Sequence, residues 1–265
     1  MRCAEPGKTF VLLIGHGSRL PHNKEMADMH ARLLKNKGYR VYTAFNEMTD
    51  PSIEETMYAM VGDGAEEIVV LPLFIAPGRH TDADIPIKLG IPEGYGSRVS
   101  SRYGRDVIVH YKEPFGDDPG VTDILLRRLK ETDCSGSTGV LVFAHGSPLR
   151  YNSELVNRTS GRLRDSGVRN VFVGFNEYNE PSIEDSYAEM IGAGFDRIIM
   201  LPMFLASGAH ISEEIPGKLG IPEGGRGGTV TKGGRNITVL YTEPLGLCPE
   251  INDILVRKIE SSILS

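Results

Sequence analysis

The sequence predicts an α/β fold of two tandem homologous domains, each a doubly wound parallel sheet, related by pseudo-twofold symmetry. Three observations support this prediction. The chain has 265 residues, which suits two domains of about 130 residues each. One half of the chain repeats the other. Apolar segments of strand length also alternate with segments of helical pattern, which is typical of parallel strands joined by helices.

The internal repeat covers most of the chain. Its matching segments are 10–26 with 140–155, 45–80 with 175–210, 85–94 with 215–224, and 112–129 with 242–259. The spacing between equivalent residues changes by only one position along the repeat, so the chain is a fused pair of homologous halves. The polar, glycine- and serine-rich stretch 131–139 is typical of a linker. We therefore place the domains at 1–134 and 135–265.

The elements of the first half begin with residues 10–14, a continuous apolar run expected of a strand buried on both faces. Pro21 fits the first turn of a helix that runs to about Lys37, and Gly38 stops it. The second strand is expected at 41–45.

A second helix is expected to begin at Pro51, capped by Asp50, with acidic residues in its favourable first turn. The third strand is expected at 68–75, followed by a short helix, a fourth strand at 107–111 and a closing helix. The glycine-rich, basic segments 94–104 and 224–234 are either mobile flaps over a cleft or flexible connections before the last strand, and we favour connections.

Composition excludes several classes of protein. The formal net charge of −6 argues against a general nucleic-acid binder, although local positive groups can still bind an anionic small molecule. Apolar runs are too short for a membrane span, and the N-terminus lacks a signal-peptide pattern, so we expect a cytoplasmic protein with no membrane partner. Cys3, Cys134 and Cys248 form no CxxC spacing and are read as incidental.

Two histidines per half follow predicted strands. His16 comes directly after the first strand and His80 after the third; His145 and His210 are their counterparts. If the strand order is 2-1-3-4, the first and third strands are neighbours at the switch point, where ligands bind in open α/β sheets. The two histidines of one half would then lie side by side. The other histidines, His22, His30 and His110, have no counterpart and are taken as ordinary fold residues.

Acidic residues near the histidines have two interpretations each. Glu47 and Glu177 follow the second strand of each half, where they either bind backbone amides in a turn or serve as carboxylate partners of a histidine. Asp82 and Asp84, with Glu213 and Glu214 opposite, either cap the next short helix or supply oxygen ligands, and capping is favoured. Gly15 and Gly17 permit a tight turn and a close approach of a flat ligand, and Ser18 with the following helix N-terminus offers donors to an anion.

These residues resemble the small class II tetrapyrrole chelatases, specifically the CbiX-type sirohydrochlorin cobaltochelatases. The similarity is carried by GHGSR at 15–19, by the segment FNEMTDPSI at 45–53, and by LPLFIAPGRHTDADIP at 71–86 followed by LGIP. It covers nearly all of each half. In that family a short form dimerises around one cleft and a long form fuses the two copies, and this chain is similar to the long form.

The resemblance implies a function and a set of site residues. The expected activity is insertion of a divalent metal into sirohydrochlorin in cobalamin-type tetrapyrrole biosynthesis. The expected metal ligands, which also help to deprotonate the ring, are His16, His80, His145 and His210. The expected anchors for its carboxylates are Ser18, Arg19, Arg79 and Ser147. The second half departs from the first at Pro148, Ala209 and Ile211, which stand in place of Arg19, Arg79 and Thr81.

The implied partners are the tetrapyrrole and the metal ion, and no cofactor is expected to stay bound. Co²⁺ is expected first, with Ni²⁺ or Fe²⁺ as alternatives, because imidazole accommodates all three. Neutral imidazole also accepts a proton near neutral pH. A monomer is expected, since the two halves can mimic a homodimer. The other hypotheses are a non-catalytic metal or tetrapyrrole carrier and a phosphohistidine phosphatase, which normally needs an arginine directly before its histidine.

Overall fold

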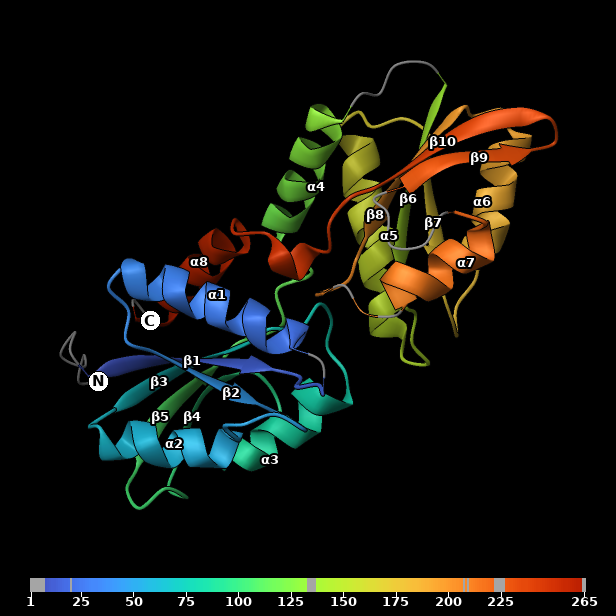
Figure 1. Cartoon of the computed structure of the whole chain (residues 1–265). Coiled ribbons are helices and arrows are strands. Elements are labelled where there is room, and N and C mark those ends of the chain that lie inside the picture. The colour runs from blue at the N-terminus through green and yellow to red at the C-terminus, as the bar shows by residue number, and fades with distance from the viewer. Residues whose placement is uncertain are drawn as a thin grey trace. The chain divides into compact units, whose positions relative to one another are not determined.

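The computed structural model describes residues 8–19, 21–132, 137–206, 208, 210–221 and 227–263, except the side chain of His210. These residues form two compact units (Figure 1). Unit 1 comprises Met1–Gly116 and Pro249–Ser265, and unit 2 comprises Asp117–Cys248. Cys3 and residues 133–136 of the predicted linker, which include Cys134, lie outside the described residues. Cys248 is buried. In the described part of the chain, no helix is both long and apolar enough to cross a membrane.

The compact units differ from the predicted division at 134/135, because the last helix of each repeat packs in the unit built by the other repeat. Helix α4 (Pro119–Glu131) belongs to unit 2, and α8 (Ile251–Ile263) belongs to unit 1. In unit 1, α8 packs beside α1 (His22–Asn36), where the Asn252 amide donates to Nδ1 of the buried His30 over 2.6 Å. Thr122 and Thr159 occupy the equivalent positions of α4 and α5 (Arg150–Asp165) in unit 2.

The sheet of unit 1 has the order β2-β1-β3-β5-β4. Its parallel strands are β1 (Thr9–Gly15), β2 (Val41–Phe45), β3 (Glu67–Pro72) and β5 (Val107–Tyr111). Their order confirms the predicted 2-1-3-4 arrangement. Strand β4 (Gly96–Ser100) pairs antiparallel with β5 at the sheet edge, so the prediction of a flap or a flexible connection over 94–104 is wrong.

Unit 2 repeats this sheet in the order β7-β6-β8-β10-β9. Its parallel strands are β6 (Thr138–Ala144), β7 (Val171–Phe175), β8 (Arg197–Pro202) and β10 (Arg235–Tyr241). The antiparallel edge strand β9 (Gly227–Lys232) again replaces a predicted flexible connection, although 222–226 lie outside the described residues. Helices α6 (Ile183–Gly192) and α7 (Ile215–Leu219) complete the unit, with a short 3-10 helix, η3 (Leu245–Leu247), after β10.

Helices cover both faces of the unit 1 sheet, with α1 and α8 on one face and α2 (Ile53–Gly62) and α3 (Ile85–Leu89) on the other (Figure 1). Helix α2 begins two residues later than predicted. Its cap is Ser52, whose hydroxyl accepts from the Glu55 amide while the Glu55 carboxylate accepts from the Ser52 amide. The prediction that Asp50 caps this helix is therefore wrong.

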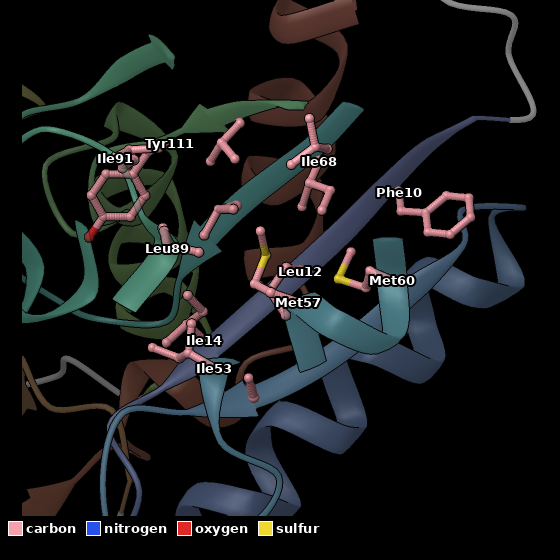
Figure 2. Packing of buried hydrophobic residues seen from close by; sticks show 14 of the residues in the cluster. Phe10, Leu12, Ile14, Ile53, Met57, Met60, Ile68, Leu89, Ile91 and Tyr111 are labelled. Atoms are coloured by element: carbon pink, nitrogen blue, oxygen red, sulfur yellow. The ribbon is translucent and has the colours of Figure 1, made fainter. Parts of the chain in front are cut away.

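The core explains why the first strand is continuously apolar. Phe10, Leu12 and Ile14 point toward α2, where they pack with a cluster that includes Ile53, Met57 and Met60 (Figure 2). The alternate residues Val11 and Leu13 point to the other face and are also buried. A strand covered on both faces needs apolar side chains at every position.

Each sheet leads into a π-helical turn, η1 (His80–Asp84) in unit 1 and η2 (His210–Glu214) in unit 2. Such turns are rare and occur frequently at functional sites. Two tyrosines hold η1: Tyr111 Oη donates to the Thr81 carbonyl and Tyr95 Oη donates to Asp82 Oδ1, both over 2.7 Å. Burial raises the pKa of both tyrosines, so their hydroxyls stay protonated and donate.

Gly17 lies where the loop after β1 meets the loop after β2. Its φ is +91°, and a Cβ there would lie 1.7 Å from the Glu47 carbonyl oxygen. The amides of Asn46 and Glu47 donate to the carbonyls of Gly15 and His16 over 3.0 and 2.9 Å. Only glycine permits this approach of the two loops.

Gly17→Ala is expected to destabilise unit 1, because a Cβ adds overpacking of about 1–3 kcal/mol to left-handed strain of about 1 kcal/mol. Gly38→Ala is the matched control, since Gly38 has a φ of +93° and nothing within 4 Å of a built Cβ. Urea unfolding followed by circular dichroism compares them. Equal losses in the two variants would contradict the role of the close approach.

Tyr111→Phe is expected to lower the free energy of unfolding of unit 1 by about 1–3 kcal/mol, because the buried Thr81 carbonyl loses its donor. The control is Tyr241→Phe, at the equivalent position of unit 2. The Tyr241 hydroxyl is buried without a hydrogen-bond partner among the described residues, so its removal should be neutral or stabilising. Thermal unfolding measures both, and a larger loss for Tyr241→Phe would refute the assignment.

Candidate functional site

The ends of β1 and β3 bring two histidines of unit 1 together. His16 follows β1, and His80 opens η1 after β3, which is the neighbour of β1 in the sheet. Their ring centroids lie 4.6 Å apart with the ring planes nearly perpendicular, at 81°. The expectation that the two histidines of one half lie side by side is confirmed in unit 1.

Three polar groups surround Nδ1 of His80. Asp84 Oδ2 lies 2.8 Å away, the Asn46 amide nitrogen 3.1 Å, and Glu47 Oε1 3.5 Å. The bond to Asp84 is the shortest and involves a charged acceptor, which makes it the strongest of the three contacts. We therefore assign the proton of His80 to Nδ1, so the Asn46 amide lies beside this N–H without donating to it. The lone pair of Nε2 is then left to bind a metal or accept a proton.

His16 has the same tautomer by the same argument. Its Nδ1 lies 3.0 Å from the Gly17 carbonyl oxygen, which can only accept. Nε2 of His16 is therefore unprotonated when the ring is neutral. The two rings, one in contact with the other, offer two nitrogen lone pairs at the strand ends.

Glu47, His80 and Asp84 form a candidate metal cluster, because each offers a ligand atom and these atoms lie within 4.8 Å of one another. Their side chains are about one-third exposed, at 37%, 34% and 29%. Asp84 makes no capping bond at the start of α3, so the favoured prediction of capping is wrong for this residue. Asp82 also does not cap; it accepts from Thr81 and Tyr95.

The equivalent residues of unit 2 have different partners. His145 Nε2 lies 3.9 Å from Glu177 Oε1, and the side chain of His210 lies outside the described residues. Glu214, the counterpart of Asp84, accepts from Lys218 Nζ and from Asn176 Nδ2, both over 3.0 Å. Burial alone would lower the pKa of Lys218, but the hydrogen bond with Glu214 and the charges of Glu184 and Glu214 raise it.

The predicted substrate anchors lie close in sequence to the histidines of their own unit, Ser18, Arg19 and Arg79 in unit 1 and Ser147 in unit 2. The Ser18 amide donates to Thr49 Oγ1 over 3.0 Å and the Ser147 amide donates to Asn179 Oδ1 over 2.8 Å, so both amides are already used within the fold. Arg19 is exposed. Arg79 is 85% exposed, with Nε 3.9 Å from Asp84 Oδ1. The geometry thus favours the two arginines over the two serine amides as anion-binding groups.

Sequence reasoning missed Asn46 and Lys88. Lys88 Nζ donates to both the carbonyl oxygen and Oδ1 of Asn46, the latter over 3.0 Å, and so turns the amide nitrogen of Asn46 toward His80. The available signal was the repeat itself, since Asn46 and Lys88 recur as Asn176 and Lys218. The histidines taken as fold residues lie elsewhere: His30 bonds α8, His110 bonds Ser97, and His22 is exposed near Glu25.

Comparison with known proteins identifies related chains. The sirohydrochlorin cobaltochelatase of Methanosarcina acetivorans is 35% identical over 127 residues, which are 47% of this chain and 96% of that protein. The sirohydrochlorin cobaltochelatase of Methanococcoides burtonii is 36% identical over 125 residues, which are 47% of this chain and 95% of that protein. Each alignment covers about half of this chain.

Solved structures share the fold of the whole chain. SirB from Bacillus subtilis with Fe³⁺ superposes with a TM-score of 0.77 at 23% identity, covering 97% of this chain and 96% of that chain. The sirohydrochlorin chelatase SirB from Bacillus subtilis subspecies spizizenii in complex with cobalt has a TM-score of 0.68 at 20% identity, with the same coverage. The CbiX family model matches residues 10–132 and again residues 139–262. The chain therefore belongs to the CbiX family and contains two copies of its domain.

Proposed function

We propose that this chain inserts a divalent metal, cobalt first, into sirohydrochlorin. The observation that carries the proposal is the meeting of His16 and His80 beside Glu47 and Asp84 in unit 1. The names of the relatives support the substrate, since both are sirohydrochlorin cobaltochelatases. We propose the same role for His145 and His210 in unit 2, with Glu177 as the carboxylate partner.

The chemistry requires a place for the ion and a place for two protons. A divalent metal replaces two pyrrole N–H protons of the ring, so the two nitrogens that carry these protons must lose them as the metal binds. Nε2 of His16 and Nε2 of His80 each have a lone pair that can accept one proton or hold the ion. The carboxylates of Glu47 and Asp84 add negative charge, which stabilises the ion before transfer and an imidazolium after it.

The periphery of the substrate gives the arginines a role. We propose that Arg79 and Arg19 bind carboxylates of sirohydrochlorin, because an exposed guanidinium at the rim can form paired hydrogen bonds with a carboxylate. Ser18 and Ser147 remain proposed substrate contacts through their hydroxyl groups. Pro148 and Ala209 replace the two arginines in the second repeat, so this anchoring belongs to unit 1.

Cobalt is proposed first because of the names of the relatives, whereas imidazole and carboxylate ligands accept cobalt, nickel and iron. The deciding experiment is anaerobic insertion into sirohydrochlorin with each metal in turn, followed by absorbance. Cobalt is expected to give the highest rate. A carrier would stop at one equivalent of product, so metallated product beyond one equivalent of protein separates an enzyme from a carrier.

His16→Ala and His80→Ala are each expected to reduce the rate of cobalt insertion by at least about 100-fold, the loss typical of a removed acid–base group. Their effect on the thermal unfolding temperature should be small, because both rings lie at the sheet edge. His22→Ala, which removes an exposed histidine on α1, serves as control. Insertion rates equal to wild type in both variants would defeat the assignment.

Asp84→Asn keeps the size of the side chain but removes its charge. It is expected to weaken Co²⁺ binding about 10- to 100-fold, because the acceptor that orients His80 loses its charge and a ligand oxygen is replaced. Isothermal titration with Co²⁺ measures the change. The matched control is Asp28→Asn, an exposed carboxylate on α1 paired with Lys24, which should bind Co²⁺ as wild type does.

A further inference from the structure

The residue after each site glutamate is large, apolar and exposed. Met48 follows Glu47, and Tyr178 follows Glu177 at the equivalent position of the repeat. The two residues are 67% and 65% exposed. Both have left-handed backbone conformations, with φ of +55° and +61°. Neither methionine nor tyrosine favours this conformation, which is usually taken by glycine or asparagine.

Both features are unfavourable for folding. Left-handed backbone strains a residue that has a Cβ, and an exposed apolar side chain gains little from burial. Such strain concentrates at sites of function, where the surrounding structure imposes it. Here the preceding residue is held against the neighbouring loop, since the Glu47 and Glu177 amides donate to the carbonyls of His16 and His145 over 2.9 and 2.8 Å.

The position of Tyr178 relative to His145 indicates what the side chain is for. Its ring is stacked against the His145 ring, with centroids 6.4 Å apart and an interplanar angle of 28°. The two rings thus face nearly the same direction at the end of β6. A nearly parallel pair of flat groups, one of them two-thirds exposed, offers a surface onto which a planar conjugated ligand can stack.

Tyr58 provides a contrast within the same chain. It is similarly exposed, at 59%, but its ring packs edge-on against Tyr103 with centroids 4.9 Å apart. Tyr58 lies on α2, and its contact with Tyr103 joins that helix to the segment after β4. Its exposure therefore accompanies a packing role in the fold.

We propose that Met48 and Tyr178 are substrate-contact residues, each of which meets the flat apolar face of the tetrapyrrole ring in its own unit. The ligand class is a planar conjugated macrocycle. The aromatic ring of Tyr178 stacks on such a face, and the polarisable thioether of Met48 packs against it. This inference rests on the proposed function and adds two residues that recognise the ring independently of the metal and of the peripheral carboxylates.

The test uses Tyr178→Asn and Met48→Asn in the full-length chain, because asparagine tolerates a positive φ and so preserves the loop. Each variant is expected to raise the Kd for metal-free sirohydrochlorin about tenfold, the loss of one stacking contact. Absorbance titration of sirohydrochlorin measures this. Co²⁺ binding measured by calorimetry should stay as in wild type, and the thermal unfolding temperature should stay equal or rise.

Four further outcomes make the test decisive. Tyr178→Phe is expected to restore the affinity that Tyr178→Asn loses, because the ring face returns without the hydroxyl. Tyr58→Asn, the control, should leave sirohydrochlorin binding unchanged. If wild type binds and metallates sirohydrochlorin while both asparagine variants bind it equally well, the inference is refuted and the proposed function stands. If wild type neither binds nor metallates sirohydrochlorin, the proposed function itself fails.

Discussion

The close approach of the loops after β1 and β2 is the constraint on which the site depends. Gly17 lies against the Glu47 carbonyl, where a Cβ would be 1.7 Å away, and Gly146 lies against the Glu177 carbonyl, where it would be 1.8 Å away. Backbone hydrogen bonds join the same loops in both units. Because the loops are fixed to each other, an imidazole from the first and a carboxylate from the second hold their positions before any ligand arrives. A site built this way has little conformational freedom to lose on binding.

The repeat preserves this backbone frame while its polar partners differ. In unit 1 Asp84 bonds His80, and Lys88 bonds Asn46. In unit 2 the lysine at the equivalent position bonds both the asparagine and Glu214, which raises the pKa of Lys218. The longer glutamate reaches the ammonium group that the aspartate does not. The extra methylene group of Glu214 thus lets its carboxylate pair with a lysine, whereas the Asp84 carboxylate pairs with a histidine. Duplicated sites can therefore diverge without any change in the strands.

Much of the frame was predictable because its signals are local. Strands 41–45 and 107–111 have the predicted bounds, and the histidines follow their strands as expected. The edge strand β4 was missed because its residues are mostly exposed and lack an apolar pattern. The packing of α4 in unit 2 and of α8 in unit 1 could not be predicted, because these homologous helices have nearly the same apolar face. Asp84 was read as a cap because sequence does not show that a π-helical turn places it against His80.

The exposure of the candidate metal cluster fits the proposed function, which requires a site that holds an ion and then releases it. A structural metal site is closed by four ligands and excludes water. Glu47, His80 and Asp84 instead combine one nitrogen with carboxylate oxygens, and each is about one-third exposed. Such ligands bind first-row metals without the strength of thiolates. Because each of these side chains is partly exposed, the proposed transient holding of the ion and the access that its acceptor needs would follow from the same geometry.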